Sequence, residues 1–251
     1  MDVAIITGVT SGLGLEFLKQ VTTKYPTLDE IWVIARRKDR LESICKNFSR
    51  IKPIALDLCQ KQSITEFTEL LQEIKPNVKI LINNAGFGEL GEFYNNNLDS
   101  QMSMIDLNNR ALTAMCTVCA KYMEKGAFII NVSSIASFAP NIRMAVYSST
   151  KAYVTSFTRC IREELRPKKI NALAVCPGPM ATEFLSVAGI EGGKSKTFEI
   201  LPYCKPARVA KRAVECAAKG KGMYTPTPFY KFYRILAKVL PHSLVMKLCK
   251  T

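Results

Sequence analysis

The chain begins with a short apolar run that ends in a glycine-rich turn, and this combination constrains the fold more than any other feature. Residues 3–6 read Val-Ala-Ile-Ile, which is typical of a buried strand, and the turn Thr7-Gly8-Val9-Thr10-Ser11-Gly12-Leu13-Gly14 follows directly. A helical pattern then runs from Leu15 to about Thr23. A strand, a glycine turn and a helix in this order open a doubly wound α/β sheet, where a pyrophosphate can approach the backbone and the helix N-terminus. We therefore favour a cofactor here over a tight turn without a ligand.

Further strands alternate with helix-length segments along the chain. The expected strands are residues 31–35, 52–56, 79–82, 127–132 and 170–175, and the expected helices are about 63–74, 99–125 and 147–166. Strands separated by helices indicate a parallel sheet with helices on both faces, which is a three-layer Rossmann fold. Because there is no internal repeat, low-complexity tract or linker, we expect residues 1–251 to form a single domain. The loop rich in Gly and Lys at residues 189–196 follows the sixth strand and marks no boundary.

Polar and glycine-containing segments follow the ends of several expected strands. The glycine turn follows the first strand, Asp57 the third, Asn83-Asn84-Ala85-Gly86 the fourth, Ser134 the fifth and Pro177-Gly178 the sixth. Ligands of open α/β sheets bind beyond the carboxyl ends of the strands. We therefore expect these segments to converge on one edge of the sheet.

The second strand ends in Ala35-Arg36-Arg37, which bears on the kind of dinucleotide that the fold would hold. Folds that choose NAD place a carboxylate here to hold the ribose 2′-hydroxyl, and a 2′-phosphate would be repelled by that group. The acid is absent, and a guanidinium can form a bidentate bond to a phosphate. We therefore favour NADP(H) over NAD(H), the alternative being two exposed arginines that open the next helix.

The segment Tyr147-Ser148-Ser149-Thr150-Lys151 is a candidate for proton transfer. A lysine four residues after a tyrosine shares its helical face, and its charge would favour the phenolate over the phenol, whose unperturbed pKa is about 10. Such a pair could move a proton to or from an alcohol. About one pair with this spacing is expected by chance among the nine tyrosines, so the surrounding residues decide its meaning.

The cysteines and the histidine argue against a metal site, and we expect none. The nine cysteines stand mostly in apolar or helical stretches at irregular spacings, as free thiols do in a reducing compartment. Cys116 and Cys119 have a redox or zinc spacing, but no second cysteine pair or nearby histidine completes a site. The only histidine, His242, lies near the end of the chain, which disfavours a serine–histidine hydrolase and a histidine-ligated zinc enzyme.

The charge of the chain is concentrated near its end. The formal net charge is +14, and residues 194–251 alone hold 13 Lys and Arg against two Glu, a net charge of +11. Residues 226–251 form a basic amphipathic segment, with apolar groups at helical spacing between cations in residues 229–240. Two interpretations stay open: peripheral contact with an anionic membrane surface, or a helix docked on the subunit or on a neighbour.

The sequence lacks the signals of a membrane or secreted protein. No apolar run approaches the ~20 residues of a membrane-spanning helix. The first strand begins at Val3, which leaves no room for a signal peptide. We therefore expect a cytoplasmic protein, peripheral to a membrane if the basic segment binds one.

Taken together, these motifs resemble those of the classical short-chain dehydrogenases/reductases. The resemblance covers about residues 3–185 and follows the order and approximate spacing of the family. Its motifs are TGxxxGxG at residues 7–14, NNAG at 83–86, Asn108, Ser133-Ser134, the Tyr147 and Lys151 pair, and Pro177-Gly178 with Thr182. The resemblance implies an NAD(P)-dependent oxidoreductase that interconverts a secondary alcohol and a ketone.

The resemblance also implies a role for each matching residue. Ser134 stands thirteen positions before Tyr147, which is the family's spacing and selects it over Ser133. Tyr147 would protonate the carbonyl oxygen and Ser134 would bond it, while Lys151 would lower the tyrosine pKa and bond the nicotinamide ribose. Asn108 would anchor a water that relays protons to Lys151. The cofactor would contact Tyr147 and Lys151. It would also contact Gly8, Thr10, Ser11, Gly12, Leu13, Gly14, Arg36, Arg37, Asp57, Leu58, Asn84, Ala85 and Thr182.

Substrate choice in such a family depends mainly on a mobile loop, here about residues 179–205. Apolar residues in this loop and near other strand ends suggest a hydrophobic substrate, such as a hydroxysteroid, a ketosteroid or a 3-oxoacyl compound. Those outside the loop are Phe87, Leu90, Phe93, Phe138, Ala139 and Met144, and all could equally be ordinary lid packing. The family also implies a homodimer or homotetramer, and we expect no nucleic-acid partner. The alternative function is a non-catalytic NADPH-binding or interaction protein.

Overall fold

A computed structural model describes residues 1–190 and 196–248, and its centre is a parallel sheet of seven strands. The strands are β1 Asp2–Thr7, β2 Glu30–Ala35, β3 Ile51–Ala55, β4 Asn77–Asn83, β5 Phe128–Val132, β6 Asn171–Val175 and β7 Met223–Tyr224. Their order is β3-β2-β1-β4-β5-β6-β7, so the winding reverses between β1 and β4. All the predicted strands are present, and the predicted doubly wound sheet is confirmed. The two-residue strand β7 was not predicted.

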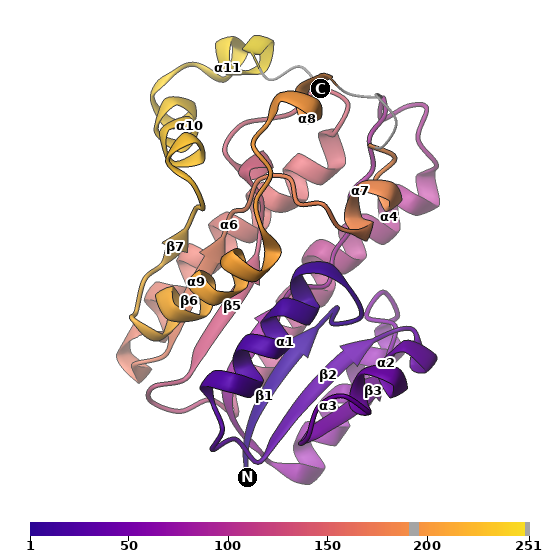
Figure 1. Cartoon of the computed structure of the whole chain (residues 1–251), viewed down its shortest axis with the longest axis vertical. Helices are drawn as coiled ribbons and strands as arrows, with labels where there is room; N and C mark the ends of the chain where they lie inside the picture. The colour runs from indigo at the N-terminus through magenta and orange to yellow at the C-terminus, as the bar shows by residue number, and fades with distance from the viewer. Residues whose placement is uncertain (191–195, 249–251) are drawn as a thin grey trace.

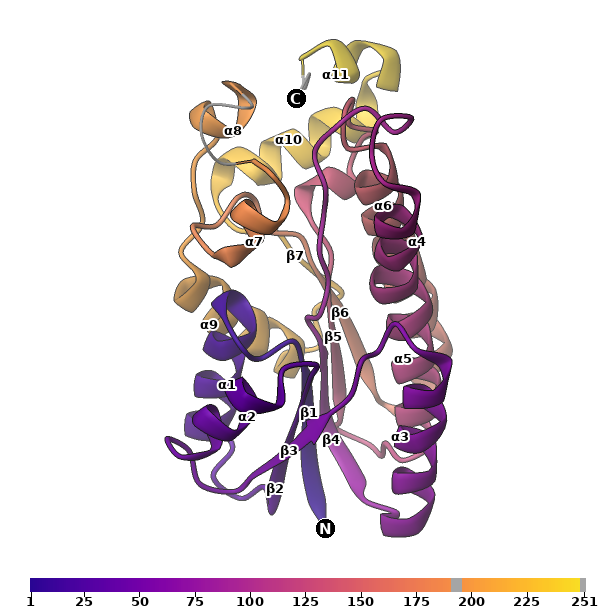
Figure 2. The same cartoon turned by 90° about the vertical axis from the view of Figure 1, so that its right-hand side faces the viewer.

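Helices cover both faces of this sheet (Figure 1). In Figure 2, α1 Gly12–Lys24, α2 Lys38–Cys45 and α9 Pro206–Ala218 lie on one side. On the other side lie α3 Lys61–Ile74, α4 Leu98–Ile105, α5 Leu112–Ala120 and α6 Ala145–Leu165. The predicted three-layer arrangement is therefore confirmed.

The central strands are apolar on both faces because both faces are covered. Ala4 and Ile6 of β1 join a buried cluster that contains Phe17 of α1. Val3 and Ile5, which alternate with them, join a second cluster that contains Phe67 of α3. Successive strand residues point to opposite faces, so a continuous apolar run is what a doubly covered parallel strand requires.

The predicted helix at about residues 99–125 differs from the observed one. It is interrupted by a π-helical segment, Asp106–Ala111, which separates α4 from α5, and α5 ends at Ala120. A π-helical turn inserts one extra residue and reorients the side chains around it, and such turns often occur at functional sites. Asn108 lies within this segment and is buried.

The last elements of the chain stand beyond the carboxyl ends of the strands (Figures 1 and 2). They include α7 Glu183–Val187, α8 Lys196–Ile200, α10 Pro228–Val239 and α11 His242–Leu248. The helix α10 begins where the Thr227 hydroxyl accepts a hydrogen bond from the Tyr230 amide at 3.3 Å, and it ends before Pro241. Most of the predicted loop at residues 189–196 lies outside the described residues. In residues 1–190 and 196–248, no helix is both long and apolar enough to cross a membrane.

Candidate active site

A cavity of about 860 Å³ lies beyond the carboxyl ends of strands β1 to β6. Its volume is within the range of pockets that hold small molecules and cofactors. The expected convergence of strand-end segments is therefore observed. The predicted residues that line the cavity are Gly8, Thr10, Ser11, Gly12, Leu13, Arg36, Arg37, Asp57, Leu58, Asn84, Ala85, Ser134, Tyr147, Lys151 and Thr182. Gly14 and Asn108 lie behind this lining.

The glycine turn is held by very close backbone packing. Gly8 and Gly12 have φ angles of +70° and +54°, which favour glycine over residues with a side chain. A Cβ atom on Gly14 would lie 2.0 Å from the carbonyl oxygen of Gly8. A Cβ on Gly12 would lie 3.1 Å from the Thr182 side chain, so the turn also touches the start of α7. The close backbone packing of the turn therefore requires glycine at these positions.

Thr7 and Asn84 connect the glycine turn to the segment after β4. The Thr7 hydroxyl accepts hydrogen bonds from the amides of Asn84 and Ala85, at 3.1 and 3.0 Å. The Asn84 side chain donates to the carbonyl oxygen of Gly8 at 2.9 Å. Asn84 was predicted to border the cofactor ribose, and it lines the cavity, but its amide group is already engaged by the turn. These hydrogen bonds of Thr7 were not predicted. The sequence feature that could have indicated them is a hydroxyl side chain at the end of a strand.

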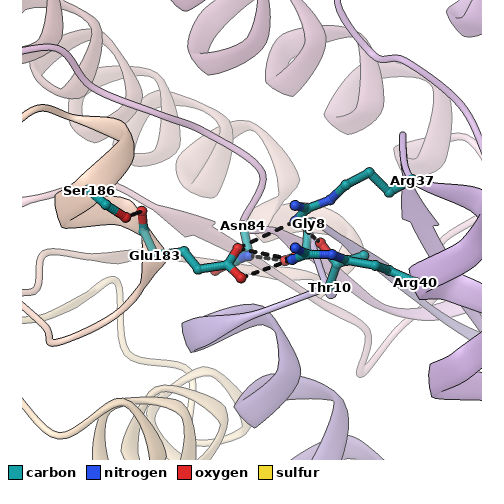
Figure 3. A network of polar contacts seen from close by, with 7 residues as sticks. All are labelled: Gly8, Thr10, Arg37, Arg40, Asn84, Glu183 and Ser186. Carbon is teal, nitrogen blue, oxygen red and sulfur yellow. Dashed lines mark hydrogen bonds and ion pairs between the residues drawn. The ribbon is translucent and has the colours of Figure 1, made fainter.

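Two arginines after β2 hold a carboxylate across the cavity (Figure 3). Arg37 donates to the Thr10 hydroxyl at 3.1 Å and approaches Glu183 Oε2 at 3.4 Å. Arg40 donates to Glu183 Oε1 at 2.9 Å. Arg40, aided by a hydrogen bond from Ser11, holds the pKa of Glu183 below its usual range, so the group is anionic at neutral pH.

These guanidinium groups already bind an anion, so they are chemically suited to a phosphate. Arg36 also lines the cavity and forms no ion pair with the described residues. Arg40 and Glu183 were not predicted as site residues, because α2 and α7 lie far apart in the sequence.

The two adjacent serines have different surroundings. Ser134 is hydrogen-bonded to Tyr147 and also accepts a bond from the Ala136 amide at 3.1 Å. Ser133 instead donates to the carbonyl oxygen of Lys151 at 2.8 Å. Ser134 is thus placed to bond a group beside Tyr147, whereas Ser133 fixes the helix that carries both Tyr147 and Lys151.

Burial dominates the acid–base properties of Tyr147 and Lys151. Both are buried, and Lys151 Nζ lies 5.7 Å from the centre of the Tyr147 ring. Burial lowers the pKa of Lys151 to about 8, and its ammonium donates to the carbonyl oxygen of Val132 at 2.9 Å. Burial raises the pKa of Tyr147 to about 12, against a smaller opposite effect of the Ser134 hydrogen bond. The expected lowering of the tyrosine pKa is therefore not seen, because the removal of water raises this pKa more than Ser134 lowers it.

Asn108 fixes the segment after β4 from its position in the π-helical turn. Its side-chain amide donates to the Phe87 carbonyl oxygen at 2.9 Å and to the Thr150 hydroxyl at 3.0 Å. Its Oδ1 accepts from the Phe87 amide at 3.1 Å. A Cβ atom on Gly86 would lie 2.7 Å from Asn108 Oδ1 and 3.4 Å from Lys151 Nζ, so a glycine is needed between these two groups. Anchoring of a proton-relay water by Asn108 stays a prediction.

The part of the cavity beside Tyr147 is apolar. Tyr147 packs with Phe184 of α7 at 5.7 Å between ring centres, and Phe87, Leu90 and Met144 belong to the same cluster. Phe138 and Ala139 belong instead to a cluster beneath α10 and α11. Of the six apolar residues expected outside the loop, Phe87 and Met144 line the cavity, whereas Leu90, Phe138, Ala139 and the 63% exposed Phe93 do not. Phe93 precedes α4 in a surface loop, a position that strand-end spacing alone does not reveal.

The described residues contain no group of His, Cys, Asp and Glu that could hold a metal ion. Cys116 and Cys119 are free and lie on the buried face of α5. Burial raises the pKa of the Cys116 thiol to about 12, so it is neutral at physiological pH. The spacing of this pair reflects core packing.

The chain belongs to the short-chain dehydrogenase family, whose family model matches residues 2–189. An NADP-dependent 3-hydroxy acid dehydrogenase of Schizosaccharomyces pombe is 30% identical over 213 residues, which are 80% of this chain and 80% of that protein. Over 95% of its length, the chain is also 26% identical to mycobacterial proteins named probable oxidoreductase EphD. It spans 43% of the length of those proteins.

Solved structures share the same fold. A short-chain dehydrogenase from Sphingobium yanoikuyae in complex with NADPH has a TM-score of 0.80 and 22% identity, covering 96% of this chain and 97% of that one. A 3-ketoacyl-(acyl-carrier-protein) reductase from Brucella melitensis with NADH has a TM-score of 0.75 and 23% identity, covering 90% and 96%. These two neighbours hold different nicotinamide cofactors.

Proposed function

We propose that this protein is an NADP(H)-dependent oxidoreductase that interconverts a secondary alcohol and a ketone. One observation carries the proposal: Ser134, Tyr147 and Lys151 lie together in one wall of a cavity whose other wall holds the glycine turn and Arg37. Bound NADP(H) would supply or accept the hydride. Thr10, Arg36 and Arg37 would hold its 2′-phosphate, and the glycine turn would hold its pyrophosphate.

The protein's own residues would manage the charge and the proton. During reduction, negative charge develops on the carbonyl oxygen, and donors fixed at that position stabilise it. The hydroxyls of Ser134 and Tyr147 are those donors, and Tyr147 releases its proton to the oxygen. A pKa of about 12 keeps Tyr147 protonated at neutral pH, which suits an acid. Lys151 then stabilises the phenolate, and Asn108 keeps the segment around Gly86 in place.

We propose a hydrophobic substrate, such as a hydroxysteroid, a ketosteroid or a 3-oxoacyl compound. Phe184 and Leu185 of α7, together with Met144, supply an apolar surface beside Tyr147. Residues 179–205, which include α7 and α8, would form the loop over this surface. The S. pombe relative is named for a 3-hydroxy acid, which fits the acyl alternative.

We also propose a single-domain subunit, residues 1–251, that forms a homodimer or homotetramer through α4 and α6. Leu98, Met102 and Ile105 on α4, with Tyr153 on α6, are exposed apolar side chains that support such a contact. The basic C-terminal segment would make peripheral contact with a membrane.

A screen of ketones and alcohols with NADPH and NADH, including steroids and acyl thioesters, tests the proposed reaction. We expect oxidation of NADPH with a hydrophobic ketone, and a lower KM for NADPH than for NADH. Tight NADPH binding without turnover of any carbonyl compound would favour a non-catalytic NADPH-binding protein instead.

A further inference from the structure

The outer face of α10 presents a row of large apolar side chains to solvent. On a surface helix that merely covers a core, this face is normally polar. The residues recur at helical spacing, and they lie opposite the side that buries Tyr230 and Ala237. Their exposed fractions are 53% for Phe229, 65% for Phe232, 59% for Ile235 and 74% for Val239.

The same apolar surface continues onto the helices around the cavity. Val187 at the end of α7 and Ile200 at the end of α8 are exposed, and Figure 2 shows α7, α8 and α10 at the same end of the molecule. Val187 and Phe229 also line the cavity, so the exposed surface and the interior of the site are continuous. We name the set Val187, Ile200, Phe229, Phe232, Ile235 and Val239 the apolar rim.

Positive charge accompanies the apolar rim. Lys231 and Lys238 are exposed on α10 beside the apolar row. After Glu215 the sequence contains seven Lys and Arg and no Asp or Glu. A second copy placed face to face would bring like charges together, which disfavours self-association through this face. An anionic surface would be attracted to it instead.

We propose that the apolar rim docks on an anionic lipid bilayer and that the cavity takes its hydrophobic substrate from that bilayer. The docking part deepens the membrane contact proposed above, and the substrate part rests on the proposed reaction. The 12 residues of α10 are too few to span a bilayer, but an interfacial helix needs only an apolar face and cations beside it. Phe, Ile and Val side chains would enter the headgroup boundary while Lys231 and Lys238 meet anionic headgroups. The cavity mouth, which the rim borders, would then face lipid.

Co-sedimentation of the full chain with vesicles rich in phosphatidylglycerol tests the docking. Phe232→Glu removes one inserted ring and adds a charge of the wrong sign, so we expect vesicle binding about tenfold weaker or worse. Phe232 does not line the cavity, which makes it suitable for this change. The matched control is Phe93→Glu, the same substitution at a residue that is 63% exposed, precedes α4 and lies outside the rim, and we expect it to bind as the wild type does. Equal loss in both variants, or no sedimentation of the wild type at low salt, would overturn the proposal.

Activity measurements separate the docking from the proposed reaction. Phe232→Glu should keep wild-type turnover of a small water-soluble ketone but lose about tenfold with a long-chain ketone dissolved in the vesicles. If the wild type reduces neither ketone, the proposed function fails, while sedimentation still tests the docking. Analytical ultracentrifugation measures the oligomeric state and so tests whether the rim is a subunit contact. If Phe232→Glu dissociates an oligomer that Phe93→Glu leaves intact, the rim is a subunit contact and the docking proposal is wrong.

Discussion

The two halves of the cavity differ mainly in their access to water. In the half beyond β1 to β3, the charged side chains of Arg37, Arg40 and Glu183 are 46%, 41% and 48% exposed. In the half beyond β4 to β6, Tyr147 and Lys151 are 8% and 5% exposed. Exposed ion pairs are worth about 0–1 kcal/mol, whereas an uncompensated buried charge is much more costly. Substitutions in the buried half should therefore affect chemistry strongly, and those in the exposed half should affect cofactor binding more weakly.

The largest effect is expected from Tyr147→Phe. The ring keeps its contact with Phe184, but the proton donor is lost, so kcat should fall by about 10³–10⁴-fold, near the upper end for a general acid. Steady-state kinetics with the best ketone from the screen measures the change, and unchanged NADPH binding shows that the cofactor half is intact. Turnover within tenfold of wild type would show that Tyr147 is not the acid.

Ser134→Ala should have the next largest effect. Loss of one donor to a developing oxyanion typically lowers kcat by about 10²–10³-fold, with little change in KM. Ser133→Ala is the matched control. The Ser133 hydroxyl donates to the Lys151 carbonyl oxygen, so it is not the donor beside Tyr147. Ser133→Ala should lower the melting temperature but change kcat only slightly. Near-normal turnover of Ser134→Ala would refute the assignment.

Lys151→Met tests whether water is excluded from the buried half of the cavity. The Lys151 pKa is lowered from 10.5 to about 8 in the folded chain, so between these pH values the unfolded chain binds a proton that the folded chain lacks. Wild-type stability should therefore rise, relative to Lys151→Met, by about 3 kcal/mol as pH increases from 8 to 10.5. Urea denaturation at several pH values measures this difference, and the contribution of Tyr147, common to both proteins, is largely removed by the comparison. A constant difference would mean that Lys151 is solvated.

Arg36→Ala and Arg37→Ala test the exposed half. A hydrogen bond to a charged group contributes about 1.5–3 kcal/mol, so each variant should bind NADPH about tenfold or more weakly. NADH lacks the 2′-phosphate, so its affinity should change less than threefold. Fluorescence titration with both cofactors gives the ratio. Equal losses for NADPH and NADH would remove the basis for the NADP(H) preference.

The contrast between the halves also explains what could be predicted from the sequence. Gly8, Ser134, Tyr147 and Lys151 could be predicted because each belongs to a short local motif: Gly8 and Ser134 follow strand ends, and the Tyr147 and Lys151 pair lies on one helix, α6. The fold followed from apolar periodicity, except where the signal was too short, as in β7, or depended on packing, as in the π-helical turn around Asn108. Glu183 and Arg40 meet across 143 residues of sequence, and no local pattern records such a contact. The direction of the Tyr147 pKa was missed because burial is a property of the whole fold.

Glu183→Gln should have the smallest effect, and it should act in the opposite direction. The Glu183 carboxylate binds Arg37 and Arg40 beside Thr10, so it competes with an incoming phosphate for the same guanidinium groups. Its removal should tighten NADPH binding by about two- to fivefold, the scale of an exposed ion pair, and leave NADH binding unchanged. High salt should reduce the gain, because these groups are exposed and screened.

The matched control for this change is Glu42→Gln, which removes the same charge from α2 at a pair with Lys38. It should leave NADPH binding within error of wild type. If Glu183→Gln weakens NADPH binding instead, the carboxylate orients the arginines for the phosphate and does not compete with it. The start of α7 would then be part of the cofactor site, and the exposed half of the cavity would be preorganised in the same way as the buried half.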